Sequence, residues 1–358
     1  MIPDAPLDVA PVRPGEELDW SALEQYLRAN LPELSGDFRV LQFPNGSANL
    51  TYFVQFGDRP LVVRRPPFGQ IAPGAHDMRR EYRALSKLWQ RFDKAPRAFL
   101  FCDDQRVIGS DFLVIEYRSG VVIWGPIPPS MAAHVDVGRR VGHALVDALA
   151  ELHLVDAEDV GLGDLGRPDG FVERQVAGWT KRWELAARAD AEPLMTVVGE
   201  RLAAAMPTAP RSAILHNDFK LDNCQFDPAD PDHVKSIFDW DMATLGDPFV
   251  DLGILLNYWP DPTDTDGDRP IYNPGMDALG LPTRAEVVER YAARTGFDVA
   301  DVYWYEAFAC WKTAVVLQQL HTRYVRGEST DERMAKKGDN IAPQARRAMT
   351  ILDRAGRS

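Results

Sequence analysis

Short apolar runs separated by polar turns fill the first third of the chain, which is the pattern of β-strands. The turn at residues 44–49 and the pair Gly57-Asp58 divide the first three runs. The predicted strands are residues 38–43, 50–56, 61–64, a run around Phe99, and 112–116. Apolar residues at helical spacing begin near Glu17 and return at residues 76–91. The pattern therefore predicts a small antiparallel sheet with one inserted helix.

Beyond Gly120 the spacing of apolar residues becomes helical over long segments. The predicted helices are residues 131–154, 171–187 and 193–205, the first with Val135, Val141, Leu145, Leu149 and Leu152 on one face. A hairpin with its turn at residues 227–232 interrupts the helices, which resume after Asp251 around one Asp- and Pro-rich loop. This predicts an α+β protein with an N-terminal tail at residues 1–16, a small β-rich lobe at 17–117, and a helical lobe at 118–358 that carries a catalytic hairpin at 214–241.

Composition narrows the class of protein. The chain has 358 residues, 45% hydrophobic and 26% charged, with a formal net charge of −13. Such an acidic balance disfavours partners that need a basic surface, namely nucleic acids and anionic membranes. The three cysteines are far apart, the start is Pro-rich and acidic, and every apolar stretch is too short to span a bilayer. We therefore expect a cytoplasmic protein; its oligomeric state is left open.

One motif carries most of the candidate chemistry. Residues 216–223 read H-x-D-x-x-x-x-N, the spacing of a kinase catalytic loop, and a further carboxylate, Asp239, follows. A carboxylate can accept the proton of an acceptor hydroxyl, so Asp218 is the predicted base. Lys220 could offset charge on the transferred phosphoryl group. Asn223 and Asp239 offer the hard oxygen ligands that Mg²⁺ prefers.

The small lobe holds the candidates for nucleotide binding. Arg64 ends a predicted strand where a kinase usually offers lysine, and Glu81 on the following helix could hold it in place. Ser47 and Asn49, in a turn with one glycine, could offer polar groups to the phosphates.

The last small-lobe strand ends at Glu116 and Tyr117. In kinases the backbone at this position hydrogen-bonds adenine. We therefore assign both residues to nucleotide binding, through the extended geometry of the chain more than through their side chains.

These motifs resemble the aminoglycoside phosphotransferase and choline kinase-like family. Residues 216–223 and 239–252 match specifically, and weaker matches in family order extend the resemblance over about residues 37–255. Residues 64–67 and 239–248 look most like the branch found fused to acyl-CoA dehydrogenases, whose members are linked to phosphorylation of 4-hydroxyacyl compounds. The resemblance implies a bilobal protein kinase-like fold, ATP, Mg²⁺ and a small-molecule acceptor with a hydroxyl group.

The chain departs from the patterns that it resembles at three places. Arg64 replaces a common lysine, and Trp240-Asp241 replaces the Phe-Gly that follows the metal-binding Asp in protein kinases. Only seven residues separate Asp239 from Asp247, which leaves no room for an activation loop. A protein substrate is therefore not expected.

Two sequence features point to different acceptors. The stretch at residues 259–268 has four aspartates and no basic residue, which would attract a polyamine such as an aminoglycoside unless it is a solvated loop. The aromatic helix at residues 303–311 would suit an acyl-bearing acceptor unless it is core. The leading interpretation is an ATP-dependent small-molecule O-phosphotransferase. The alternatives are a hydroxyacyl-CoA or hydroxy acid kinase, favoured if Lys312 and Arg323 lie near the site, and a nucleotide-binding pseudokinase.

Overall fold

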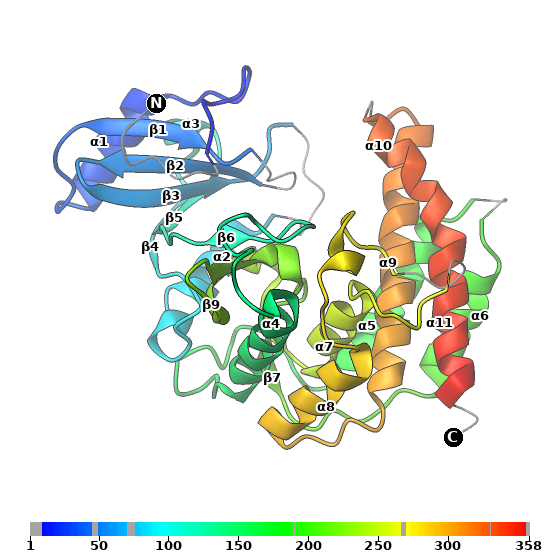
Figure 1. The fold of residues 1–358 in the computed structure, drawn as a ribbon. Helices are drawn as coiled ribbons and strands as arrows, with labels where there is room; N and C mark the ends of the chain where they lie inside the picture. Colours follow the sequence, from blue (N-terminus) through cyan, green and yellow to red (C-terminus); the bar gives the residue numbers. More distant parts are fainter. Residues whose placement is uncertain are drawn as a thin grey trace. The chain divides into compact units, whose positions relative to one another are not determined.

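The structure is a computed structural model that describes residues 9–44, 49–69, 76–188, 191–265, 270–329 and 331–355. The chain folds into two compact units. The first unit comprises the chain up to Val121 together with Ala157–Leu165 and Lys235–Ala243. The second comprises Val122–Asp156, Gly166–Val234 and the chain from Thr244 onward. The predicted α+β class is confirmed, since strands dominate the first unit and helices the second (Figure 1).

The first unit is built on a five-stranded antiparallel sheet. Its strand order is β1-β2-β3-β5-β4. The strands are β1 (Phe38–Gln42), β2 (Leu50–Phe56), β3 (Arg59–Arg65), β4 (Ala98–Cys102) and β5 (Phe112–Glu116). The predicted bounds of β2 and β5 are therefore correct, and β3 is longer than predicted. Helix α1 (Trp20–Asn30) packs Leu23 and Leu27 into the same core as Tyr52 and Val54.

The helix predicted at residues 76–91 is shorter in the structure than the sequence pattern indicated. Helix α2 (Met78–Leu85) begins after the N-cap Asp77, whose side chain accepts a hydrogen bond from the Arg80 backbone N–H. The chain then continues as the 3₁₀ turn η1 (Leu88–Gln90) rather than as helix to residue 91. A second short helix, α3 (Gln105–Ile108), was not predicted, because four residues carry too little periodicity to be recognised.

The first long helix of the second unit starts later than predicted. Helix α4 (Val137–Leu154) follows turns at residues 131–136, and Asp136 has a left-handed backbone with φ 50°. Val135, which the pattern placed on the apolar face, is 78% exposed. The apolar periodicity thus continued beyond the N-terminal end of the true helix.

Short strands position the catalytic segment. Strand β7 (Ala213–Leu215) pairs with β10 (Thr244–Gly246), and a three-stranded sheet has the order β6-β8-β9. The strands of this sheet are β6 (Val121–Val122), β8 (Cys224–Asp227) and β9 (Asp230–Ile237). The predicted turn at residues 227–232 was too long, because β9 already begins at Asp230.

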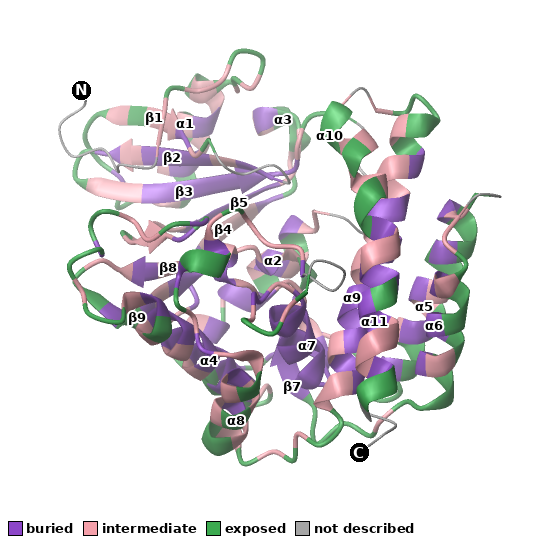
Figure 2. Ribbon diagram, turned by 45° about the vertical axis from the view of Figure 1, so that its right-hand side comes forward, coloured by how far each residue is buried: buried purple, intermediate pink, exposed green. Residues whose placement is uncertain are grey.

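The core of the second unit is a buried helix, α7 (Phe249–Asn257). Every one of its residues is buried (Figure 2). It packs against α9 (Val302–Val325) so closely that a Cβ on Gly253 would lie 2.4 Å from the carbonyl oxygen of Tyr305. The other helices are α5 (Phe171–Ala186), α6 (Leu194–Ala204), α8 (Arg284–Thr295), α10 (Glu332–Ala335) and α11 (Ile341–Ala355), with 3₁₀ turns η2 (Leu221–Asn223), η3 (Trp240–Met242), η4 (Met276–Ala278) and η5 (Lys336–Asn340).

Within the part of the chain that the structure describes, no helix has both the length and the apolar composition needed for a bilayer span.

Candidate active site

The proposed base lies in the segment between β7 and β8 in the second unit. Asp218 forms an ion pair with Lys220, whose Nζ is 2.9 Å from its Oδ2. The Asn223 side-chain nitrogen donates to the same Oδ2 at 2.9 Å and to the Asp218 carbonyl at 2.8 Å. These bonds occupy the amide nitrogen of Asn223 and leave its carbonyl oxygen as the atom suited to a metal ion. The structure thus brings together Asp218, Lys220 and Asn223.

A buried carboxylate from α7 holds the backbone of this loop. The two oxygens of Asp251 accept hydrogen bonds from the backbone N–H groups of His216 (2.6 Å) and Asn217 (2.7 Å). Burial alone would raise the pKa of Asp251, but the hydrogen bond from His153 and the bond from His216 outweigh burial and lower it. An ionised Asp251 fixes Asn217 in its left-handed conformation, with φ 66°, directly before the proposed base.

The histidines have structural positions. His216 is buried, and its Nδ1 accepts a hydrogen bond from the Asp218 backbone N–H at 3.2 Å. His153 is also buried, with Tyr291 Oη 2.6 Å from Nδ1 and Asp251 Oδ2 3.4 Å from Nε2. His216 therefore braces the loop directly, and His153 is a core residue that contacts the loop through Asp251.

Lys220 is held in its charged form. Burial acts to lower its pKa, but the negative charges of Asp218 and Asp222 outweigh burial and raise it. Its ammonium nitrogen also lies 5.5 Å from the centroid of the Tyr258 ring. A positive charge is thus fixed beside the proposed base.

Two residues that lie next to Asp218, Lys220 and Asn223 were not identified from the sequence. Asp222 lies close enough to Lys220 to raise its pKa, and Asn273 donates to Asp222 at 3.4 Å. Lys312 of α9 donates to the carbonyl of Asn217 at 3.4 Å, and burial lowers its pKa. Asp222 could have been identified from the sequence, since it lies within the motif at residues 216–223. Lys312 had been considered only for a coenzyme A substrate.

A second group of candidate residues lies in the first unit. Arg64 pairs with Glu81 at 2.9 Å and with Asp239 at 2.7 Å. The side chains of Arg64 and Glu81 are 6% and 0% exposed. Burial raises the pKa of Glu81 to about 7, although the charge of Arg64 opposes this. The strand and helix positions predicted to bring Arg64 and Glu81 together do so, and Asp239 completes the group.

Polar atoms around this group fit a phosphate-bound metal. Asn49 donates to Asp241 at 3.4 Å, and His76 Nδ1 lies 4.0 Å from the same carboxylate. Among the described residues, Asn49 Oδ1, Arg64 Nε and His76 Nδ1 are buried atoms without a hydrogen-bond partner. Buried polar atoms are normally paired, so their clustering indicates a ligand. A guanidinium donor and an amide oxygen are the groups that phosphate and Mg²⁺ require.

The remaining nucleotide candidates have different surroundings. Ser47 lies outside the described residues. The Glu116 carboxylate accepts hydrogen bonds from the Arg97 backbone at 3.0 Å and from Arg118 at 2.9 Å. The Tyr117 ring packs edge-on against Phe53 at 5.1 Å. None of these contacts directs the Glu116 carboxylate or the Tyr117 ring toward Arg64.

The two predicted metal ligands belong to different units, Asn223 to the second and Asp239 to the first. Within the described ranges, no cluster of three or more His, Cys, Asp or Glu side chains could hold a metal ion by itself. A Mg²⁺ ion that shares its coordination with phosphate oxygens and water does not need such a cluster. Metal binding by Asn223 and Asp239 stays a prediction.

The two acceptor signals have structural explanations. Asp261 accepts hydrogen bonds from the backbone of Thr263 and Arg284, and Asp264 pairs with the Arg284 side chain with only 6% of its own side chain exposed. Both carboxylates are therefore bonded within the protein, and Asp264 is nearly buried, while Asp266 and Asp268 lie outside the described residues.

Most aromatic residues of α9 are core, whereas Tyr303 is half-buried. Trp304, Tyr305, Phe308 and Trp311 are buried, with Trp304 stacked on Phe308. Arg323, near the end of the same helix, is exposed.

Comparison with known proteins identifies relatives along most of the chain. Residues 39–305 match the phosphotransferase enzyme family. Acyl-CoA dehydrogenase family member 10 of Mus musculus is 30% identical over 97% of this chain, and member 11 of Rattus norvegicus is 30% identical over 98%. The chain spans only 32% and 45% of the lengths of these two relatives. The predicted resemblance to the branch associated with acyl-CoA dehydrogenases is confirmed.

Solved structures confirm the kinase-like fold. A Ralstonia eutropha JMP134 protein proposed to be an aminoglycoside phosphotransferase has a TM-score of 0.78 and 28% identity, covering 94% of this chain and 99% of its own. An aminoglycoside phosphotransferase in ternary complex with ADP and hygromycin B has a TM-score of 0.57 and 14% identity, with the same coverage, which shows likeness of fold alone. By its sequence match over residues 39–305, this chain belongs to the phosphotransferase enzyme family.

Proposed function

We propose that the protein is an ATP-dependent kinase that transfers a phosphoryl group to a hydroxyl of a small molecule. The observation that carries this proposal is the geometry around Asp218. One oxygen of this carboxylate is held by Lys220 and Asn223, each at 2.9 Å, and its backbone is fixed by the loop that Asp251 anchors. A carboxylate held in this way can orient an acceptor hydroxyl and accept its proton.

Each neighbour has a distinct proposed role. Lys220 stabilises negative charge near the reacting oxygen, because Asp218 and Asp222 keep it protonated. In the first unit, Arg64 would donate to nucleotide phosphates, and Glu81 holds it in place. Asp239 in the first unit and the carbonyl oxygen of Asn223 in the second are each proposed as ligands of Mg²⁺, which supplies neutralisation of phosphate charge when bound.

The test is a comparison of two aspartate variants. Asp218→Ala should abolish phosphoryl transfer while leaving ATP binding within a few-fold of wild type, since Asp218 acts on the acceptor. Asp232→Ala is the matched control, because Asp232 lies on the β8–β9 hairpin and pairs with Arg140. Phosphoryl transfer is measured by ADP release and nucleotide binding by calorimetry. Equal turnover in Asp218→Ala and wild type would refute the assignment of the base.

A hydroxyacyl thioester or hydroxy acid is the second candidate for the acceptor. Two observations favour it over a polyamine. The relatives at 30% identity are named acyl-CoA dehydrogenase family members. Asp261 and Asp264, which had suggested a polyamine, are bonded within the protein. A screen of ADP release over hydroxyacyl-CoAs, aminoglycosides and amino alcohols decides between these acceptors, and turnover with an aminoglycoside alone would contradict the acyl candidate.

A further inference from the structure

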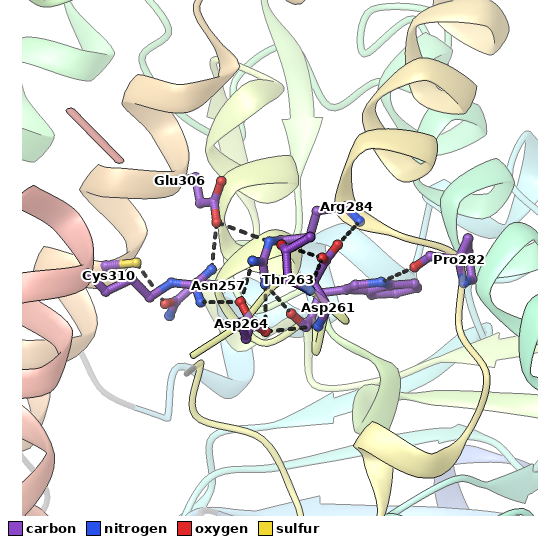
Figure 3. A network of polar contacts seen from close by, with 10 residues as sticks. Asn257, Asp261, Thr263, Asp264, Pro282, Arg284, Glu306 and Cys310 are labelled. Carbon is purple, nitrogen blue, oxygen red and sulfur yellow. Dashed lines mark hydrogen bonds and ion pairs between the residues drawn. The ribbon is translucent and has the colours of Figure 1, made fainter. Parts of the chain in front are cut away.

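A pocket of about 380 Å³ opens in the second unit beside the first turns of α8 and α9 and the C-terminal half of α11. No candidate active-site residue lines it. Its charged and aromatic lining comprises Asp264, Arg284, Tyr303, Glu306, Arg347 and Arg354, and we call it the arginine pocket. Its volume is in the range of small-molecule sites. Figure 3 shows several of these residues converging from separate segments of the chain.

Two arginines and two carboxylates form a network in the wall of this pocket. Arg284 pairs with Asp264 and lies 3.6 Å from Glu306. Arg347 is 2.6 Å from Glu306 and 3.7 Å from Asp264, with 3% of its side chain exposed. Burying four charges adds little net stability, because the cost of desolvation offsets the attraction between them. Stability alone is therefore a weak reason for this network.

The pocket carries one more positive than negative charge. Arg354, near the end of α11, is exposed, and no other described residue forms an ion pair with it. Tyr303 and Thr350 add hydroxyl groups to the lining. In a chain with a net charge of −13, an arginine-rich pocket is a local exception. Guanidinium and hydroxyl donors suit an oxyanion.

We propose that the arginine pocket binds a small dianion, whose carboxylate or phosphate groups contact Arg354 and share the guanidinium groups of Arg284 and Arg347. The carboxylate of Glu306 already pairs with these two guanidinium groups, so it competes with the ligand for them. This binding does not depend on the proposed phosphoryl transfer.

Polar contacts link the pocket to the catalytic loop. Arg347 hydrogen-bonds Cys310, and the Cys310 thiol donates to Asn257 at 3.1 Å. Asn257 donates to Thr313 at 2.9 Å, and Thr313 hydrogen-bonds Tyr258, whose ring faces Lys220. These contacts connect the arginine pocket to the loop that carries the proposed base. The dianion has two sources that the test must distinguish: the acidic end of the acceptor, or a separate metabolite.

The test uses the full chain without nucleotide, titrated by calorimetry with malonate and with inorganic phosphate. Arg354→Gln should weaken binding about tenfold, the loss expected for one charge-assisted contact. Arg346→Gln, the same change at an exposed position of α11 outside the pocket, should bind as wild type does. Absence of binding to the wild type, or equal binding by the two arginine variants, would overturn the proposal.

Glu306→Gln provides a test with the opposite sign. Because Glu306 competes for Arg347 and Arg284, its neutralisation should tighten malonate binding several-fold, whereas a purely structural network predicts no gain. Weaker binding by a folded Glu306→Gln protein would contradict the proposal. In the ADP-release assay, malonate that competes with the acceptor identifies the acceptor's acidic end, and a change in turnover without competition identifies a separate metabolite. An effect of malonate that is unchanged in Arg354→Gln would overturn both.

Discussion

Arg64 offers the sharpest test of how the first unit is built. Its guanidinium lies 2.9 Å from Glu81 and 2.7 Å from Asp239, and the Glu81 side chain is fully buried. Arg64→Met leaves that carboxylate buried without its cation, which costs about 3–5 kcal/mol of unfolding free energy. Arg64→Met combined with Glu81→Met removes both charges and fills similar volume. The double variant should therefore be more stable than Arg64→Met alone.

The effect should depend on pH with a defined sign. Burial raises the pKa of Glu81 to about 7, and Arg64 opposes this rise. Without Arg64, the carboxyl group can take up a proton at low pH and escape the cost of a buried charge. The loss of stability in Arg64→Met is thus expected to be larger at pH 8 than at pH 6, and the double variant, which has no carboxyl group at this position, should show no such increase.

The assay is urea unfolding of the wild type, both single variants and the double variant, followed by circular dichroism at the two pH values. Arg39→Met, at an exposed position of β1, is the control for removing an arginine from the same sheet. ADP affinity, measured by calorimetry, should be lost in Arg64→Met and should not return in the double variant. If the costs of the two single changes simply add, the two residues are not coupled and the reasoning is refuted.

Two further predictions concern the second unit. Burial raises the pKa of Asp247 to about 6, against hydrogen bonds from Tyr305 and Phe249, so the folded protein retains a proton that the unfolded chain releases above about pH 4. Stability should consequently fall by up to about 3 kcal/mol between pH 4 and 6; Asp247→Asn should flatten this part of the urea-midpoint profile, and an unchanged slope would contradict the assignment. Lys312→Met removes the bond to the Asn217 carbonyl and should lower turnover about 10- to 100-fold, the loss expected for a charge-assisted bond, with unchanged nucleotide affinity. A matching loss of nucleotide affinity would argue for general disruption.

The sequence by itself determined the local features. Short apolar runs bounded by polar residues predicted the bounds of β2 and β5 because each strand's pattern is contained within a few residues. Asp218, Lys220 and Asn223 lie within six residues of one another, so the conformation of a single loop brings them together. The same local reasoning failed at α4, where apolar spacing continued past the left-handed Asp136 that precedes the helix.

Only the tertiary structure decided which distant side chains meet. Asp251 reaches the loop from 35 residues away and Lys312 from 95, and no periodicity encodes either contact. The acidic stretch shows the same limit, because its composition suggested free negative charge until Arg284 was found paired with Asp264. The charge that a segment presents depends on which other groups lie within a few ångströms of it. Packing determines those neighbours, and packing is a property of the whole unit rather than of any segment.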